Sequence, residues 1–231
     1  MITIVRFVRF MVVPVLLLAL GACQHTAQEP YDYSKLRADD PHSVLIVLPV
    51  NRSVEVEAPQ YFLSTISRPV AEKGYYVFPV NLVKRVMEEE GMSDADLVYN
   101  SDPTVLGELF GADSILYISI DEWTSKYIVL DTQTTVSFSY SLKSGHSGET
   151  LWESSSSIAY SPNQGNSNGG LIGLVVQAVA AAVEKASPNY IPLSRKANYW
   201  AVNATGKGLL PGPYHKDYGM TEEAPAEPVV N

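Results

Sequence analysis

The sequence contains a single cysteine, Cys23, among its 231 residues. No disulfide can therefore form within one chain, and the fold has to be held by the burial of apolar side chains. Hydrophobic residues make up 46% of the chain, which is enough for one substantial core at this length. The histidines show no metal-ligand spacing, and no second cysteine is present to join them; they are His25, His42, His146 and His215. We therefore expect neither a metal site nor a cofactor.

Basic charge is also scarce. Lysine and arginine together number 16 against 25 acidic residues, which gives a formal net charge of −9. Proteins that bind nucleic acids need a basic surface to neutralise phosphates, so the composition argues against a nucleic-acid partner. The same acidic charge disfavours broad electrostatic binding to anionic lipid.

The sequence has no apolar run of the roughly 20 residues that a membrane-spanning helix needs. The N-terminal run is shorter and covers residues 10–20; it follows Arg6 and Arg9 and ends at Gly21, Ala22 and Cys23. A positive start, a short apolar stretch and small residues before a cysteine are typical of a bacterial lipoprotein signal peptide. We expect residues 1–22 to be removed by cleavage between Ala22 and Cys23, and Cys23 to carry the lipid.

The lipid determines the expected location of the mature chain. Two or three acyl chains contribute roughly 0.8 kcal/mol per buried methylene, so the attachment would be effectively permanent. Gln24 stands at the second mature position in place of aspartate, which favours the outer membrane, with the periplasmic face preferred over the cell surface. Residues 23–42 are polar, contain two prolines and show no sustained period, so we expect a flexible tether.

The next part of the chain alternates between strand and helix patterns. A continuous apolar run at residues 43–49 predicts a buried strand, and a helical pattern follows it up to Gly74. A second buried strand is predicted at residues 75–80, followed by a helix that ends near Gly91 and another that begins at Asp102 and Pro103. Strands in this order are expected to pair in parallel through a crossover helix.

Three β runs come next, at residues 114–125, 127–142 and 149–160, and they predict an antiparallel meander. Within the second run, two sets of side chains should lie on opposite faces by the period of two: Val136, Phe138, Tyr140 and Leu142 on one, and Thr135, Ser137, Ser139 and Ser141 on the other. The whole pattern predicts one α/β domain over residues 43–190, with the order β-α-β-α-(α)-β-β-β and helices packed on the sheet.

The C-terminal part begins with an uncharged loop at residues 161–170 and an apolar stretch at residues 171–186. A helix there would be apolar all round and would be buried against its own domain, a partner or a membrane. Its apolar side chains are the candidate partner interface: Leu171, Ile172, Leu174, Val175, Val176 and Val179. Residues 191–231 are predicted to be an irregular extension with a disordered end, whose aromatic residues either cover the sheet or anchor a partner.

No segment carries a catalytic pattern. Residues 145–148 read Gly-His-Ser-Gly, but the glycine that a nucleophile elbow needs is replaced by Glu149, and the segment joins two strands. We interpret it as a turn. Asp94 and Asp96 are expected to cap a helix or lie in a loop. We assign no catalytic residue.

Three blocks of sequence carry a resemblance to a known family. They cover residues 49–53, 63–79 and 110–118, and they include Gly74-Tyr75-Tyr76-Val77-Phe78-Pro79 and Phe110-Gly111-Ala112-Asp113. Over residues 43–190 the chain resembles a bacterial lipoprotein family of unknown function, whose fold is similar to the N-terminal domain of TolB and to CsgG-type modules. Members of that family are typically encoded with a CsgG-like lipoprotein and a further small lipoprotein.

The resemblance implies a non-enzymatic accessory subunit of a cell-envelope assembly or secretion complex, held at the outer membrane by Cys23. The expected partners are the CsgG-like lipoprotein, the second small lipoprotein and, through the apolar stretch, a second copy of the chain. The alternative is a periplasmic ligand-binding or sensing lipoprotein for a glycan or lipid fragment. An enzyme is the third possibility.

Overall fold

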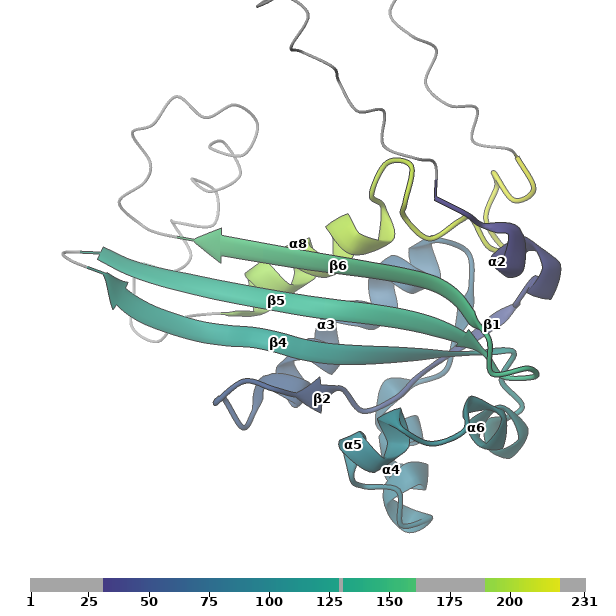
Figure 1. The fold of residues 1–231 in the computed structure, drawn as a ribbon, viewed down its shortest axis with the longest axis horizontal. Coiled ribbons are helices and arrows are strands. Elements are labelled where there is room, and N and C mark those ends of the chain that lie inside the picture. The colour runs from purple at the N-terminus through teal and green to yellow at the C-terminus, as the bar shows by residue number, and fades with distance from the viewer. Residues whose placement is uncertain (1–30, 129–130, 161–189, 221–231) are drawn as a thin grey trace, which may run out of the picture. The chain divides into compact units, whose positions relative to one another are not determined.

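The computed structural model describes residues 31–128, 131–160 and 190–220 (Figure 1). The N-terminal half contains α2 (Ser34–Asp39), β1 (Ser43–Ile46), β2 (Val50–Asn51), α3 (Ala58–Glu72), β3 (Tyr76–Val77), α4 (Val80–Glu89), α5 (Ala95–Tyr99) and α6 (Pro103–Phe110). The C-terminal half contains β4 (Ser114–Ile128), β5 (Asp131–Ser144), β6 (Thr150–Tyr160) and α8 (Tyr190–Val202). No helix within these described ranges has the length and apolar character that crossing a membrane requires.

The strands form one mixed sheet in the order β3-β1-β4-β5-β6, and β2 pairs with β4 beside this path. β1 pairs in parallel with both β3 and β4, whereas β4, β5 and β6 are antiparallel neighbours. Helices pack on this sheet, so the predicted α/β fold class and the predicted order of elements are confirmed. The parallel pairing of the first strands and the β4-β5-β6 meander were both expected from the sequence.

Apolar residues of β1 and its extension alternate between two cores. Val44 and Ile46 pack into the larger cluster with Phe62 of α3, while Leu45 and Val47 pack into a smaller cluster with side chains of α4, α5 and α6. All four residues of β1 are buried, as the continuous apolar run predicts. β3 differs from the prediction of a second buried strand. It pairs over two residues at the end of the described strand order, and Tyr76 is 52% exposed.

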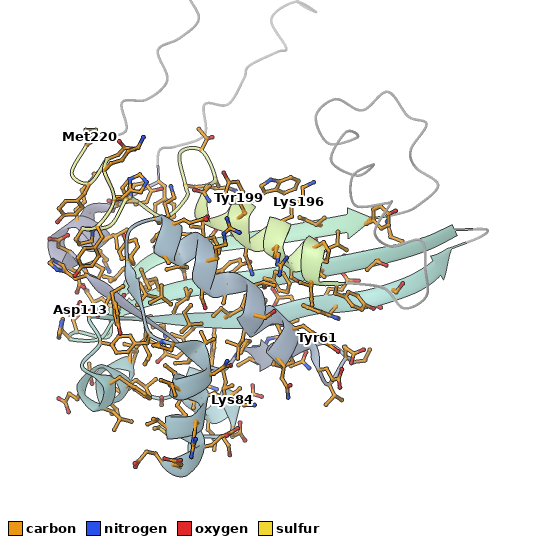
Figure 2. All side chains as sticks on the ribbon, turned by 180° about the vertical axis from the view of Figure 1, so that it is seen from behind. Tyr61, Lys84, Asp113, Lys196, Tyr199 and Met220 are labelled. Atoms are coloured by element: carbon orange, nitrogen blue, oxygen red, sulfur yellow. The ribbon has the colours of Figure 1, made fainter. Side chains whose placement is uncertain are left out.

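The predicted alternation of β5 is confirmed. Val136, Phe138, Tyr140 and Leu142 are each at most 2% exposed, and they lie under α3 and α8. Figure 2 shows these two helices lying across one side of the sheet, and Figure 1 views the side that they leave uncovered. The strand positions that alternate with these buried residues lie on that uncovered side, and they include Ser119, Ser137, Ser139, Ser141, Ser155 and Ser157.

The tether predicted for residues 23–42 is wrong for residues 31–42. Residues 34–39 form α2, and Tyr33 and Leu36 are buried in the larger core. The Tyr33 hydroxyl donates to the carbonyl oxygen of Gly208 at 2.5 Å, and the Tyr31 hydroxyl accepts from the backbone N–H of Glu153 at 2.8 Å. These contacts join residues more than a hundred positions apart, so no local sequence pattern reveals them.

The irregular extension predicted for residues 191–231 is wrong for its first part, because residues 190–202 form α8. Leu193, Ala197 and Ala201 are buried in the larger core. The proline at position 192 falls in the first turn, where its missing N–H costs nothing, so it does not prevent the helix. The following segment returns to the turn between α3 and β3, where the backbone N–H of Gly212 donates to the Lys73 carbonyl at 2.7 Å.

The remaining sequence predictions lie outside the described residues. These include Ala22 and Cys23, the loop at residues 161–170, the apolar stretch with its candidate interface (Leu171, Ile172, Leu174, Val175, Val176 and Val179) and the end of the chain at residues 221–231.

Candidate functional site

The three short helices α4, α5 and α6 lie on one side of the β1 region (Figure 1). Aspartate caps start two of them. The Asp94 carboxylate accepts from the backbone N–H groups of Asp96 and Leu97, and the Asp102 carboxylate accepts from that of Thr104. The bonds from Thr104 lower the pKa of Asp102. The cap role predicted for Asp94 is confirmed, and these carboxylates are explained by helix geometry.

The same helices expose large apolar side chains on their outer side. The inner side chains Val83, Met87, Val98 and Leu106 are buried. Leu82, Leu97, Val105 and Leu109 are 61%, 72%, 55% and 45% exposed, and Val86 is 36% exposed. Leu82 and Val86 are four residues apart on α4, and so are Val105 and Leu109 on α6, so each pair forms a continuous apolar surface on its helix. We call these five side chains the outer helix face.

Acidic residues surround the outer helix face. Glu88 and Glu89 pair with Lys84 and Arg85 of the same helix at 3.7 and 3.1 Å. Within the described part of the chain, five further exposed acids of this layer make no ion pair; they are Glu90, Asp94, Asp96, Asp102 and Glu108. The layer therefore combines apolar side chains with uncompensated negative charge.

The uncovered side of β4, β5 and β6 forms a second distinctive surface. Ser119, Ser139 and Ser155 lie directly opposite one another on the three strands. Asp121 accepts from the hydroxyls of Ser119 and Ser139 at 2.7 and 2.6 Å, and the Arg52 guanidinium donates to the Ser119 hydroxyl at 3.0 Å. We call this surface of serine and threonine side chains the hydroxyl face.

A cavity of about 420 Å³ opens on the hydroxyl face. Tyr99, at the end of α5, and Lys207, which follows α8, are among its walls, with serines and Glu153 of the sheet. The Tyr99 ring is half-buried and meets the Tyr117 ring edge-to-face, with the ring centroids 5.6 Å apart. Burial raises the pKa of Tyr117 to about 12.

A second hollow, of about 310 Å³, lies where α2 meets the segment after α8. Its walls include Leu36, Tyr75 and Pro211. The Tyr218 hydroxyl donates to the Asp40 carboxylate at 2.6 Å, and the Tyr75 hydroxyl donates to the Leu210 carbonyl at 3.0 Å. These bonds join the two ends of the described chain, and the simplest function of the hollow is structural.

The segment Gly145-His146-Ser147-Gly148 is a turn, as expected. The backbone N–H of Gly145 donates to the Asp113 carbonyl at 2.7 Å, and the Ser147 hydroxyl accepts from the backbone N–H of Glu149 at 3.3 Å. The imidazole of His146 faces the Asp113 carboxylate at 3.5 Å. In the part of the chain that the structure describes, no group of three or more histidine, cysteine or acidic side chains could hold a metal ion.

Comparison with known families matches residues 31–214 to the family described as "Putative lipoprotein GNA1162-like". The chain belongs to the GNA1162-like lipoprotein family. It is 34% identical over 198 residues to a Neisseria meningitidis protein described as "Putative lipoprotein NMB1124/NMB1162", covering 85% of this chain and 91% of the relative. It is also similar to the crystal structure of lipoprotein GNA1162 from Neisseria meningitidis, with 36% identity and a TM-score of 0.52, over 63% of this chain and all of the other.

Membership of the GNA1162-like family confirms that the chain is related to lipoproteins, which are membrane-anchored proteins. Neither description names an enzymatic activity. The matched region begins at Tyr31 and so includes α2, which the resemblance from residue 43 onwards left out.

The two surfaces identified in this structure were not predicted as sites. The alternation of serine and threonine in residues 135–141 did predict a polar sheet side, but not the cavity that Tyr99 and Lys207 close. The outer helix face could not be identified from the sequence, because its residues follow the same helical pattern as the buried ones beside them.

Proposed function

We propose that this GNA1162-like lipoprotein is a non-enzymatic interaction subunit of a cell-envelope complex, and that it binds its partner protein through the outer helix face. The observation that supports this role is the exposure of five large apolar side chains on three adjoining short helices. Exposed apolar side chains gathered with polar residues around them are typical of protein–protein contact surfaces.

The charge of this layer indicates what kind of partner fits. Glu90, Asp94, Asp96 and Glu108 add negative charge around the apolar side chains, so the complementary surface is apolar with lysine or arginine at its rim. An anionic bilayer surface would be repelled by the same carboxylates, which favours a protein as the occupant.

The proposed partner is a CsgG-like lipoprotein, and the proposed site of action is the outer membrane. The partner rests on the family resemblance of residues 49–53, 63–79 and 110–118. The location rests on Cys23 as the lipid-bearing residue and on Gln24 after it. We place the domain on the periplasmic side of that membrane, where an anchored subunit can meet other lipoproteins.

The docking surface can be tested by introducing positive charge on the outer helix face. The double variant Leu97→Arg/Val105→Arg is expected to lose at least tenfold in recovery of a CsgG-like lipoprotein from detergent-solubilised envelopes of the source bacterium, after crosslinking. Val56→Arg is the matched control, because Val56 is 85% exposed but lies in the loop before α3. Both variants should keep the wild-type circular dichroism spectrum, because exposed substitutions change stability little. Equal recovery of the CsgG-like protein by all three chains contradicts the proposal.

The anchor needs a separate test. Cys23→Ser removes the only thiol, so the chain should move from the membrane fraction to the soluble fraction and should no longer incorporate radiolabelled palmitate. Ser34→Ala is the matched control for a polar substitution near the N-terminus. A Cys23→Ser chain that still fractionates with membranes and still incorporates palmitate contradicts the assignment of Cys23.

A further inference from the structure

The hydroxyl face offers a regular array of hydrogen-bonding groups. Ser137 lies opposite Ser157, Ser139 lies opposite Ser155, and Ser141 lies opposite Glu153. Directly opposed side chains are about 5 Å apart across antiparallel strands, and successive ones on the same side are about 7 Å apart along a strand. A serine hydroxyl can both donate and accept a hydrogen bond, and the hydroxyl of Ser139, which donates to Asp121, can still accept one. A ligand lying on this array would therefore meet donors and acceptors at regular intervals.

One of these hydroxyls is buried without a partner. Ser141 is 8% exposed, lines the cavity, and its Oγ makes no hydrogen bond with the described residues. Buried hydroxyls in native proteins are nearly always bonded, and an unpaired one costs about 1–3 kcal/mol. Because this Oγ is shielded from solvent, Ser141 has to change its χ1 rotamer before a ligand hydroxyl in the cavity can supply the missing partner. This is the observation that distinguishes the cavity from an ordinary solvated sheet surface.

The walls of the cavity provide the two other features that a sugar site needs. Tyr99 presents an aromatic ring, which can pack against the C–H groups on one face of a pyranose. Glu153 and Lys207 supply an acceptor and a donor of opposite charge beside the serines. The titratable groups of the lining thus largely balance, so the site has no preference for an anionic ligand.

We propose that this cavity binds a neutral glycan, with Tyr99 stacking on a sugar ring and Ser139, Ser141 and Ser155 bonding to its hydroxyls. A peptide fits less well, because peptide-binding sites use pockets for apolar side chains, and the lining of this cavity is polar apart from the rings of Tyr99 and Tyr140. The glycan site lies on the sheet, whereas the outer helix face lies on α4, α5 and α6, so one surface can be tested without the other.

The binding can be measured on the full lipidated chain in nanodiscs by saturation-transfer NMR. The probes are chitotriose, cellotriose and maltotriose, each titrated to about 10 mM, which detects affinities in the weak range expected for a shallow polar site. At least one trisaccharide should bind saturably. Leu97→Arg/Val105→Arg should bind it with unchanged affinity, which separates this proposal from the protein-docking proposal.

Three substitutions locate the site. Ser155→Val removes one hydroxyl from the cavity and should weaken binding about fivefold to tenfold, the value of one hydrogen bond. Tyr99→Ala should remove detectable binding. Ser157→Val is the matched control: it makes the same change on the same strand and side, outside the cavity lining, and should leave the affinity unchanged. Valine is favoured in strands, so both serine variants should fold.

Three results would overturn the proposal. The first is that no trisaccharide binds saturably to the folded wild-type chain. The second is that Ser157→Val weakens binding as much as Ser155→Val. The third is that Tyr99→Ala binds as well as wild type, because the stacking surface would then lie elsewhere.

Discussion

A buried network of hydrogen bonds joins β5, α8 and α3, and we expect it to hold α8 against the sheet. The Tyr140 hydroxyl donates to Asn198 Oδ1 at 2.6 Å, Asn198 Nδ2 donates to Thr65 Oγ1 at 2.8 Å, and that hydroxyl donates to the Phe62 carbonyl at 2.6 Å. Asn198 is 0% exposed and Tyr140 is 2% exposed. The three side chains of this network are hydrogen-bonded to one another, and water cannot reach them to replace a lost partner.

The expected cost of Asn198→Ala follows from these contacts. The substitution leaves the Tyr140 hydroxyl buried without an acceptor, which costs about 1–3 kcal/mol. It also removes three heavy atoms from the core and leaves a small cavity, which adds roughly 1 kcal/mol. We therefore expect the free energy of unfolding to fall by about 3 kcal/mol. Tyr140→Phe should cost less, about 1–2 kcal/mol, because it creates no comparable cavity.

The double variant distinguishes a hydrogen-bond effect from a packing effect. Once Tyr140→Phe has removed the hydroxyl, Asn198→Ala leaves no donor without an acceptor. Its further cost in the free energy of unfolding should therefore be about 1 kcal/mol. Urea denaturation of a chain lacking residues 1–23, followed by the fluorescence of the buried Trp123 and Trp152, gives all four free energies. Costs that add to within about 0.5 kcal/mol would refute the reasoning, because they would mean that the two side chains do not interact.

Three further predictions concern other parts of the fold. Asp113→Asn should lower the unfolding free energy by about 1–2 kcal/mol at neutral pH, because Asp113 Oδ2 accepts from Ser43 Oγ at 2.8 Å and from the backbone N–H groups of Ser43 and His42. Burial raises the pKa of Asp113, but these hydrogen bonds outweigh the effect of burial and hold the pKa below its usual 3.8. The difference in unfolding free energy between wild type and Asp113→Asn, measured by urea denaturation, should therefore shrink as the pH falls below 3.8. Gly107→Ala should lower the melting temperature by several degrees, since a Cβ there would collide with the Gly145 carbonyl. The control Glu108→Ala, on the exposed side of α6, should leave the melting temperature unchanged. Equal melting temperatures for the two variants would show that α6 is not held against the turn at residues 145–148. Burial raises the pKa of Tyr117 from 10.0 to about 12, so this residue contributes stability that is complete below pH 10 and is lost as the pH rises through 12. The Tyr117→Phe variant should therefore lose less stability than wild type over that interval. Equal losses of unfolding free energy for the two proteins in urea denaturation would contradict the raised pKa of Tyr117.

Local patterns in the sequence predicted much of the fold. The period of two in β5 identified Val136, Phe138, Tyr140 and Leu142 as one buried side, because alternate side chains of a strand point to opposite faces. Asp102 followed by Pro103 identified the start of α6. The aspartate cap accepts a hydrogen bond from a free N–H group of the first turn, and proline at the first helical position has no N–H that needs a partner. Such signals involve neighbours along the chain, so they can be read without the structure.

The errors concern elements whose stability comes from distant contacts. α2 spans six residues, too few to be stable alone, and its position depends on Leu36 and on the bond from Tyr33 to Gly208. α8 has weak periodicity and a proline in its first turn, and Asn198 fixes it through Tyr140 and Thr65. β3 is short and lies at the end of the described strand order, which no local pattern shows.

Composition and local patterns were enough to predict the α/β class, the meander, the absence of any intrachain disulfide and the role of Cys23 as the lipid-bearing residue, because each of these depends on residue content or on residues close together in the chain. Which apolar side chains remain outside as the outer helix face depends on the packing of distant elements and became visible with the folded chain. The tertiary structure also brought Tyr99 and Lys207, 108 positions apart, to the serines of one sheet side. Burial and proximity are properties of the packed chain, and residues with identical local patterns can meet either protein or water.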